Sequence, residues 1–241
     1  MSVNVLILAS EPFQQSVFPT YLKEYKNSTV LQYICKNTLS KLNCDYTFIF
    51  QKDAAQKHHL DNIAKVLIPG AKVISLPGNS MGSACTALYG ACELDQDQPL
   101  LIVSTNEIVD IKYEDAIHHF LKSEADAGVM TFESVHPRYS YMKITNGDIS
   151  EFAQQNPISS LATTGSFWFK KTSDFVRLAK QSILKNTITS DRFYIAPVLN
   201  QFILENKKIS YYDVNGRYIP FKTDNYLKDT KQKSEVAHEY I

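Results

Sequence analysis

The sequence has few features of a metal-cluster protein, a membrane protein or a nucleic-acid-binding protein. Its four cysteines form no C-x-x-C pair, and no cysteine–histidine cluster follows the spacing of a zinc site. Lysine plus arginine and aspartate plus glutamate both number 25, so the formal net charge of zero gives no global attraction to nucleic acid or to an anionic membrane. No run of about 18 apolar residues is present, so we expect no membrane span.

The beginning of the sequence also lacks an export pattern. The apolar run at residues 3–9 is too short for a signal peptide and has no basic residues before it. Cysteines without an evident pairing pattern add to this, and together they favour a cytoplasmic protein. Hydrophobic residues make up 44% of the 241 residues and charged residues 21%, which is an ordinary globular composition. This length favours one α/β domain over two separate ones.

Short apolar runs alternate with helical patterns through the first half of the chain. We expect strands at residues 3–9, 46–50, 72–76 and 100–104, and helices at 29–42, 60–67, 82–94 and 113–123. Four strand–helix rounds with short connections predict an α/β fold with a mostly parallel, doubly wound sheet. Ligands of such sheets bind outside the carboxyl ends of the strands. We therefore expect a site at the loops after Ala9, Leu76 and Ser104.

The second half has a different pattern. We expect strands at residues 128–132, 141–144, 165–169 and 208–214, with helices at 173–184 and 195–205. Turn residues between the strands predict a mixed C-terminal part with antiparallel pairing. No linker rich in proline, glycine or serine separates the halves, so we expect one domain over residues 1–241 that ends in a polar tail at 228–241.

Two strings in the second half resemble a known family. Residues 152–169 read F-A-Q-Q-N-P-I-S-S-L-A-T-T-G-S-F-W-F and resemble the E-K-x-P-I-S-x-x-A-x-x-G-x-Y-x-F segment of sugar nucleotidyltransferases. Residues 193–200, F-Y-I-A-P-V-L-N, are similar to the F-Y-I-A-P-x-x-N that follows in the same proteins. Shorter matches are P-L-L-I at 99–102 and H-P-R-Y-S-Y at 136–141. Order and spacing hold over residues 1 to about 227, and the resemblance is to the GT-A-like pyrophosphorylases of capsule and surface-polysaccharide pathways.

The resemblance implies nucleotidyl transfer, in which a sugar phosphate oxygen attacks the α-phosphorus of a nucleoside triphosphate and pyrophosphate leaves. It implies a nucleotide-binding half at residues 1–126 and an acceptor-binding half at 127–227. The partners it implies are a nucleotide and a phosphorylated sugar or similar small molecule, with a homo-oligomer possible. The matching positions for nucleotide binding are Ala9, Ser10, Gly82 and Ser83. The matching positions for the acceptor are Arg138, Ser159, Thr163, Thr164, Gly165 and Tyr194.

The phosphate-binding loop departs from the family pattern. The family has G-x-G-x-R after its first strand, where glycines let backbone amides approach the phosphates. Residues 9–18 read A-S-E-P-F-Q-Q-S-V-F here, with no glycine and no arginine. Glu11 would repel a phosphate, and Pro12 removes one amide donor. The family's P-K-P that follows also lacks its lysine, because Thr20 stands there.

The metal-binding positions depart as well. Asn106 stands where the family has its first Mg²⁺ aspartate, with Glu107 next to it, and these two are our catalytic candidates. In an extended segment Glu107 would point away from Asn106. Gln154 and Gln155 replace the acid and the base of E-K-x-P, and Pro220 is nearest to a second expected aspartate. Mg²⁺ prefers carboxylates, so its usual ligands are missing. The carboxylates that could restore a site are Glu11, Glu107, Asp213 and Asp224.

Three functions stay open from the sequence. The first is a nucleotidyltransferase-like protein of surface-polysaccharide biosynthesis. The second is a catalytically inactive nucleotide- or sugar-binding or partner subunit with the same fold. The third is a sugar-nucleotide-dependent glycosyltransferase, which usually has a D-x-D metal motif, and none follows residues 100–104.

Overall fold

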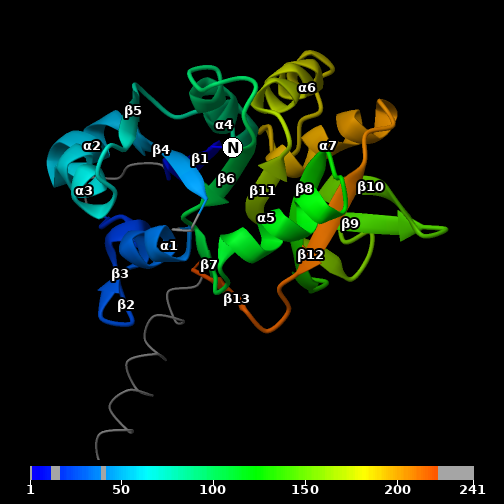
Figure 1. Ribbon diagram of the computed structural model, residues 1–241, viewed down its shortest axis with the longest axis horizontal. Helices are drawn as coiled ribbons and strands as arrows, with labels where there is room; N and C mark the ends of the chain where they lie inside the picture. Colours follow the sequence, from blue (N-terminus) through cyan, green and yellow to red (C-terminus); the bar gives the residue numbers. More distant parts are fainter. Residues whose placement is uncertain (1, 12–16, 39–41, 222–241) are drawn as a thin grey trace, which may run out of the picture.

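The computed structural model describes residues 2–11, 17–38 and 42–221. Its centre is a nine-stranded sheet whose first-half strands run parallel in the order β6-β1-β4-β5 (Figure 1). Their bounds are Ser2–Ala9 for β1, Asn43–Gln51 for β4, Lys72–Leu76 for β5 and Leu100–Ser104 for β6. These match the expected strands, and the predicted doubly wound α/β fold is confirmed. Pro12, Asp224 and the tail at 228–241 lie outside the described residues.

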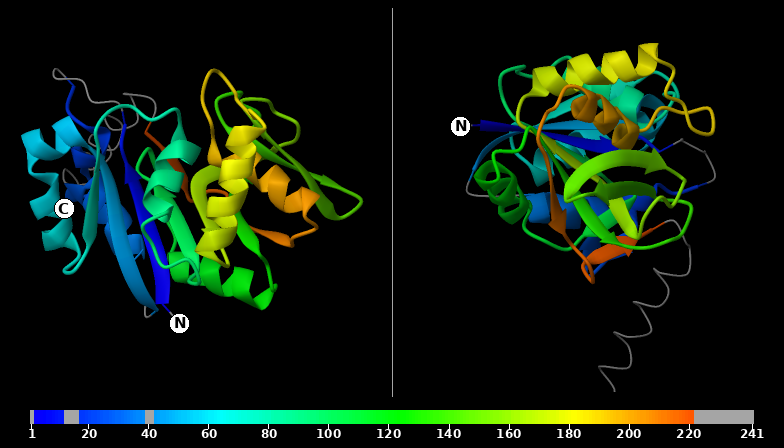
Figure 2. Two further views of the ribbon diagram at one scale, coloured as in Figure 1. Left: turned by 90° about the horizontal axis from the view of Figure 1, so that it is seen from above. Right: turned by 90° about the vertical axis from the view of Figure 1, so that its right-hand side faces the viewer.

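Helices cover both faces of this sheet because successive side chains of each strand point to opposite faces. Val5 and Ile7 of β1 pack with one set of helices, whereas Leu6 and Leu8 pack with the other set. The right-hand view of Figure 2 separates α6 and α7 from α5 across the sheet. The first set is α1 (Val30–Thr38), α2 (Lys52–His58), α3 (Leu60–Leu67) and α5 (Tyr113–Lys122); the second is α4 (Ser83–Ala91), α6 (Thr172–Leu184) and α7 (Ile195–Leu204).

The second half continues the same sheet with mixed pairing, as predicted. β11 (Leu161–Phe169) runs antiparallel to β6, and β8 (Ala127–Glu133) and β9 (Ser140–Thr145) run antiparallel to β11. β10 (Asp148–Gln154) pairs antiparallel with β9, whereas β12 (Ile209–Asp213) pairs parallel with β8. β11 is therefore the strand that joins the two halves.

The sequence pattern did not predict several short elements. They are the 3-10 turn η1 (Thr20–Leu22), the hairpin of β2 (Glu24–Tyr25) and β3 (Ser28–Thr29), the helix α2, the polar strand β10, and the pair β7 (Glu107–Val109) and β13 (Tyr218–Pro220). The last pair matters for the site, because it places Pro220 directly opposite Glu107. In the part of the chain that the structure describes, no helix is long and apolar enough to cross a bilayer.

Candidate functional site

A cavity of about 460 Å³ opens where the two halves of the sheet meet, beyond the carboxyl ends of β1 and β6. This volume lies within the usual range for small-molecule sites. Ten of the twelve residues expected at the site border it: Ser10, Gly82, Ser83, Asn106, Glu107, Arg138, Thr163, Thr164, Gly165 and Tyr194. The sequence therefore predicted positions that the fold brings together from both halves of the chain.

Two expected residues do not border the cavity. Ala9 is fully buried inside the sheet, where it lies opposite Phe50 of β4. Ser159 donates a hydrogen bond from its hydroxyl to the carbonyl oxygen of Met142 at 2.6 Å and accepts one from the backbone N–H of Leu161 at 3.0 Å. Ser159 thus shapes the turn that leads into β11.

Glu107 borders the cavity, and both oxygens of its carboxylate accept hydrogen bonds. Its side chain is buried, and its Oε1 accepts a hydrogen bond from the backbone N–H of Gly165. Its Oε2 accepts a hydrogen bond of 3.0 Å from the hydroxyl of Tyr218 on β13. A Cβ atom at residue 165 would lie 2.7 Å from Cβ of Ser104 and 3.2 Å from Oε1 of Glu107, so close packing accounts for Gly165. Burial, followed by the charge of Glu107, raises the pKa of the Tyr218 hydroxyl far above its ordinary range.

Asn106 and Glu107 both border the cavity, contrary to the expectation that they point apart. The backbone bends at residues 105–106, so the segment between β6 and β7 is not extended. Asn106 is exposed to solvent, and its carbonyl oxygen accepts a hydrogen bond of 3.2 Å from the backbone N–H of Phe221. Both residues therefore border the cavity, Asn106 exposed and Glu107 buried.

The turn before α4 borders the cavity at the positions that the resemblance assigns to the nucleotide. Gly82 has a φ of +119°, and a Cβ atom there would lie 2.2 Å from the carbonyl oxygen of Phe193. The backbone N–H of Phe193 donates to the carbonyl oxygen of Met81 at 2.7 Å, and the N–H of Ala84 donates to Phe193 at 3.0 Å. The glycine is thus required by the docking of this turn against the F-Y-I-A-P segment, which brings a turn of the first half next to a string of the second half.

Hydroxyl groups and two arginines border the cavity where the resemblance places the acceptor. Thr163 is 4% exposed, and its hydroxyl has no hydrogen-bond partner among the described residues. Ser140 donates a hydrogen bond to the side-chain oxygen of Gln154. Arg138 borders the cavity as expected, and Arg192 joins it from the loop before α7. Arg192 was not among the expected site residues, because it lies just before the F-Y-I-A-P string.

The carboxylates at this cavity do not fit a Mg²⁺ site. Among the described residues, the acids that border it are Glu11 and Glu107. Glu11 accepts a hydrogen bond from the backbone N–H of Thr20, and Glu107 accepts one from the backbone N–H of Gly165. Burial raises the pKa of Glu11, which works against the charged form that Mg²⁺ needs. Asp213 does not border the cavity and instead accepts the backbone N–H of Asn215 at 2.9 Å. No group of three histidine, cysteine or acidic side chains suited to a metal occurs within the described ranges.

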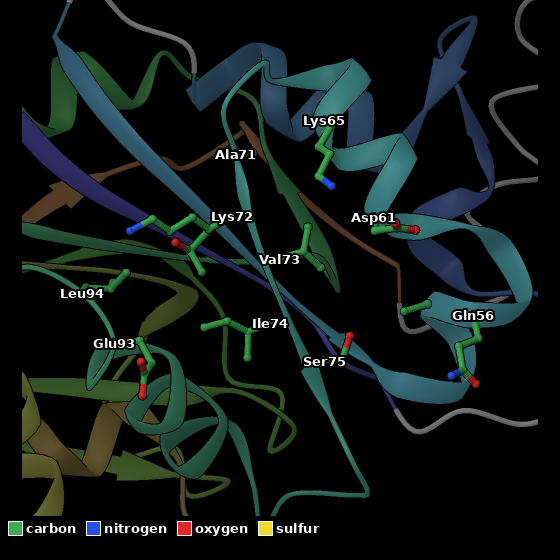
Figure 3. Close-up of a pocket in the computed structure, with 12 residues that line it drawn as sticks. Gln56, Asp61, Lys65, Ala71, Lys72, Val73, Ile74, Ser75, Glu93 and Leu94 are labelled. Atoms are coloured by element: carbon green, nitrogen blue, oxygen red, sulfur yellow. The ribbon is translucent and has the colours of Figure 1, made fainter.

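A larger hollow of about 730 Å³ lies elsewhere, against the edge strand β5 (Figure 3). It shares no lining residue with the cavity between the halves. In Figure 3 its side chains are spread along β5, with Gln56 and Asp61 on one side and Glu93 on the other, and they do not point toward one centre. Convergent polar groups mark a binding site better than volume does, so the smaller cavity is the candidate site.

Comparisons with known proteins agree on the fold. No family model and no curated protein matches the sequence. Among solved structures, a nucleoside-diphosphate-sugar pyrophosphorylase from Vibrio cholerae RC9 superposes with a TM-score of 0.76 at 16% identity, over 93% of this chain and 98% of that one. A Bacillus anthracis protein described as a glucose-1-phosphate thymidylyltransferase, in complex with sucrose, gives 0.71 at 16% identity, over 94% and 93%.

A third similar structure is CMP:2-keto-3-deoxy-manno-octonic acid synthetase complexed with CTP. It superposes with a TM-score of 0.67 at 11% identity, over 99% of this chain and all of that one. The chain therefore has the nucleotidyltransferase fold, extended over nearly its whole described length. By their names, the similar proteins act on or bind nucleotides and sugars.

Proposed function

We propose that the cavity binds a nucleotide together with a phosphorylated sugar or a similar phosphorylated small molecule. In this proposal the chain serves surface-polysaccharide synthesis as a binding or partner subunit with the nucleotidyltransferase fold. The observation that supports it most is the hydrogen bonding of the Glu107 carboxylate. The cavity is built from both halves of the chain, yet its buried carboxylate is already bound by Gly165 and Tyr218.

A nucleoside triphosphate carries several negative charges that a transferase must neutralise during the reaction. In this cavity the end of β1 supplies Ser10 and Glu11, and Glu11 repels phosphate. Asn106 brings an oxygen ligand without charge. These features support ligand binding without the strong charge neutralisation that fast phosphoryl transfer requires.

Nucleotidyl transfer itself is the second candidate, and one observation favours it. Asn106 and Glu107 stand together at the carboxyl end of a central strand, where the resemblance places the reaction. Pyrophosphate release with a panel of nucleotides, sugar phosphates and Mg²⁺ or Mn²⁺ distinguishes the candidates. Turnover that Asn106→Ala or Glu107→Ala abolishes would establish the transferase and remove the inactive subunit.

The binding proposal is tested by thermal unfolding in the presence of nucleotides, with EDTA and with Mg²⁺. A ligand that binds the folded state raises Tm, and a concentration of about 100 times Kd adds roughly 2.7 kcal/mol. We expect at least one nucleotide to raise Tm in EDTA. Ser83→Tyr should remove the shift, because Ser83 borders the cavity. Ser173→Tyr is the matched control, a serine in the first turn of α6 that does not border it. Absence of any shift at millimolar nucleotide would contradict the proposal.

A further inference from the structure

The first half of the chain brings acids but no cation to the cavity. Among its described residues that border the cavity, Glu11 and Glu107 are acids, and none is a lysine, an arginine or a histidine. Its other bordering residues have hydroxyl, amide or apolar side chains, apart from Gly82. The cations that border the cavity among the described residues belong to the second half. The positions that the resemblance assigns to the nucleotide therefore lie among neutral and acidic groups.

We infer that this part of the cavity takes a nucleoside or a nucleoside monophosphate and selects against a triphosphate, with Glu11 as the residue that determines the selection. The inference rests on the proposed function, because it names the class of nucleotide that the same cavity binds. Like charges that face one another in a complex lower its affinity, and such repulsion is a common source of specificity. Each phosphate added to the nucleoside brings further negative charge into a cavity that already holds Glu11.

Glu11 is fixed at the cavity by a contact with η1. Its Oε1 accepts a hydrogen bond of 2.5 Å from the backbone N–H of Thr20. Thr20 stands where the family has a lysine, so this neighbour holds the carboxylate without balancing its charge. Burial raises the pKa of Glu11, and the charge of Lys23 is the smallest of the effects that lower it. Lys23 does not border the cavity, so it does not offer a cation to a ligand there.

Neutral groups of the first half are held in place around the cavity. The buried amide of Gln51, at the end of β4, donates from Nε2 to the carbonyl oxygen of Gly78 at 3.0 Å and to Oδ1 of Asn79 at 3.2 Å. The hydroxyls of Ser80 and Thr86 share a hydrogen bond of 2.5 Å. A base and a ribose offer uncharged donors and acceptors, which groups of this kind match without charge neutralisation.

Calorimetric titration of the full chain in EDTA tests the inference with defined probes. They are adenosine, guanosine, cytidine, uridine and thymidine, together with the 5′-monophosphate and the 5′-triphosphate of each. For a base that binds, we expect the triphosphate to bind at least about tenfold more weakly than the nucleoside or the monophosphate. EDTA removes divalent cations, so the comparison reports the effect of the side chains alone.

Glu11→Gln tests whether this residue determines the selection. The variant keeps an acceptor oxygen for the Thr20 N–H and removes the charge. It should strengthen triphosphate binding by about tenfold and leave the Kd of the nucleoside unchanged. Glu133→Gln is the matched control, an exposed glutamate at the end of β8 that does not border the cavity, and it should change neither Kd. Circular dichroism of each variant checks that the fold is retained.

The outcomes separate the selection from the proposed function. A triphosphate that binds wild type as tightly as its nucleoside, or more tightly, overturns the selection and leaves the proposed function standing, because a nucleotide then binds. A weakly bound triphosphate whose Kd is not improved by Glu11→Gln overturns the role of Glu11. Binding of a nucleoside without binding of either of its phosphates supports the selection and overturns the proposed function. No binding of any of these compounds at millimolar concentration overturns both.

Discussion

The backbone N–H of Gly165 donates a hydrogen bond to the Glu107 carboxylate across 58 residues of sequence. This contact joins the start of β7, which follows β6 in the chain, to the middle of β11, and so links the two halves of the chain at the cavity. The second carboxylate oxygen is held by Tyr218 from β13. Three separate segments therefore meet on one acid, which gives Glu107 a role in the architecture of the cavity.

Glu107→Gln should destabilise the protein. The glutamine oxygen can accept from Gly165 and its NH₂ can donate to the Tyr218 hydroxyl, but both bonds then lose the charge of the carboxylate. Replacing two charge-assisted bonds by neutral ones costs about 1–3 kcal/mol. Urea unfolding measures the change, with Glu133→Gln as the control because Glu133 is exposed at the end of β8. Equal stability of wild type and Glu107→Gln would show that the two contacts do not hold the carboxylate.

Gly165→Ala should also destabilise the protein, by about 1–3 kcal/mol, because its methyl group would overlap the side chain of Ser104 at 2.7 Å. Gly78→Ala is the control, since a Cβ atom at Gly78 has nothing within 4 Å. That substitution should change stability by less than about 0.5 kcal/mol. Chemical unfolding of both variants gives the comparison. A neutral Gly165→Ala would mean that β11 and the end of β6 are not in close contact.

The sequence predicted the elements whose stability comes from an apolar pattern. β5, β6 and α3 appear at the expected residues, because continuous or periodic apolar side chains define them. β10 was missed because D-I-S-E-F-A-Q is mostly polar, and pairing with β9 stabilises it. β7 and β13 are three residues each and depend on one another across the chain. α2 has alanine as its only buried residue type, which leaves too weak a pattern.

The sequence motifs predicted part of the candidate site, but they did not predict the residues whose position depends on backbone geometry. The resemblance placed Gly82, Gly165 and Tyr194 at one cavity, and the structure brings them there. The direction of Glu107 depends on a bend at residues 105–106 that no motif encodes. Arg192 reaches the cavity through a turn whose two central residues are neither glycine nor asparagine, so the sequence carried no clear turn signal.

Tyr218→Phe should reduce stability by about 1–2 kcal/mol at neutral pH, because Glu107 loses a donor. The ring should stay in place, since it stacks on Phe132 at 3.8 Å between centres. The raised pKa of Tyr218 adds a pH dependence. Its contribution is complete below about pH 10, where an unfolded tyrosine is neutral, and is lost as the pH rises above that value. Unfolding curves at pH 7 to 11 should thus show a smaller alkaline loss in Tyr218→Phe, and parallel losses would contradict the contact.

Glu11→Gln should raise Tm at pH 7. Burial raises the pKa of Glu11 despite the hydrogen bond from Thr20, so the charged form destabilises the folded state. The stabilising contribution of the neutral form is present below about pH 4.3, the ordinary glutamate pKa, and is lost as the pH rises. The advantage of Glu11→Gln should accordingly shrink as the pH is lowered toward that value. Thermal unfolding at pH 4 to 8 measures it, and a lower Tm of the variant at pH 7 would disprove the burial argument.

We propose that this cavity binds its ligands without a Mg²⁺ ion held by Glu107. The most direct test is calorimetric titration of the nucleotide that gives the largest thermal shift, in EDTA and in Mg²⁺, with wild type and Glu107→Gln. Because Gly165 and Tyr218 already donate hydrogen bonds to the Glu107 carboxylate, we expect wild type to bind with the same Kd in both buffers. A gain of about tenfold or more with Mg²⁺ that Glu107→Gln removes would show the carboxylate to be a metal ligand.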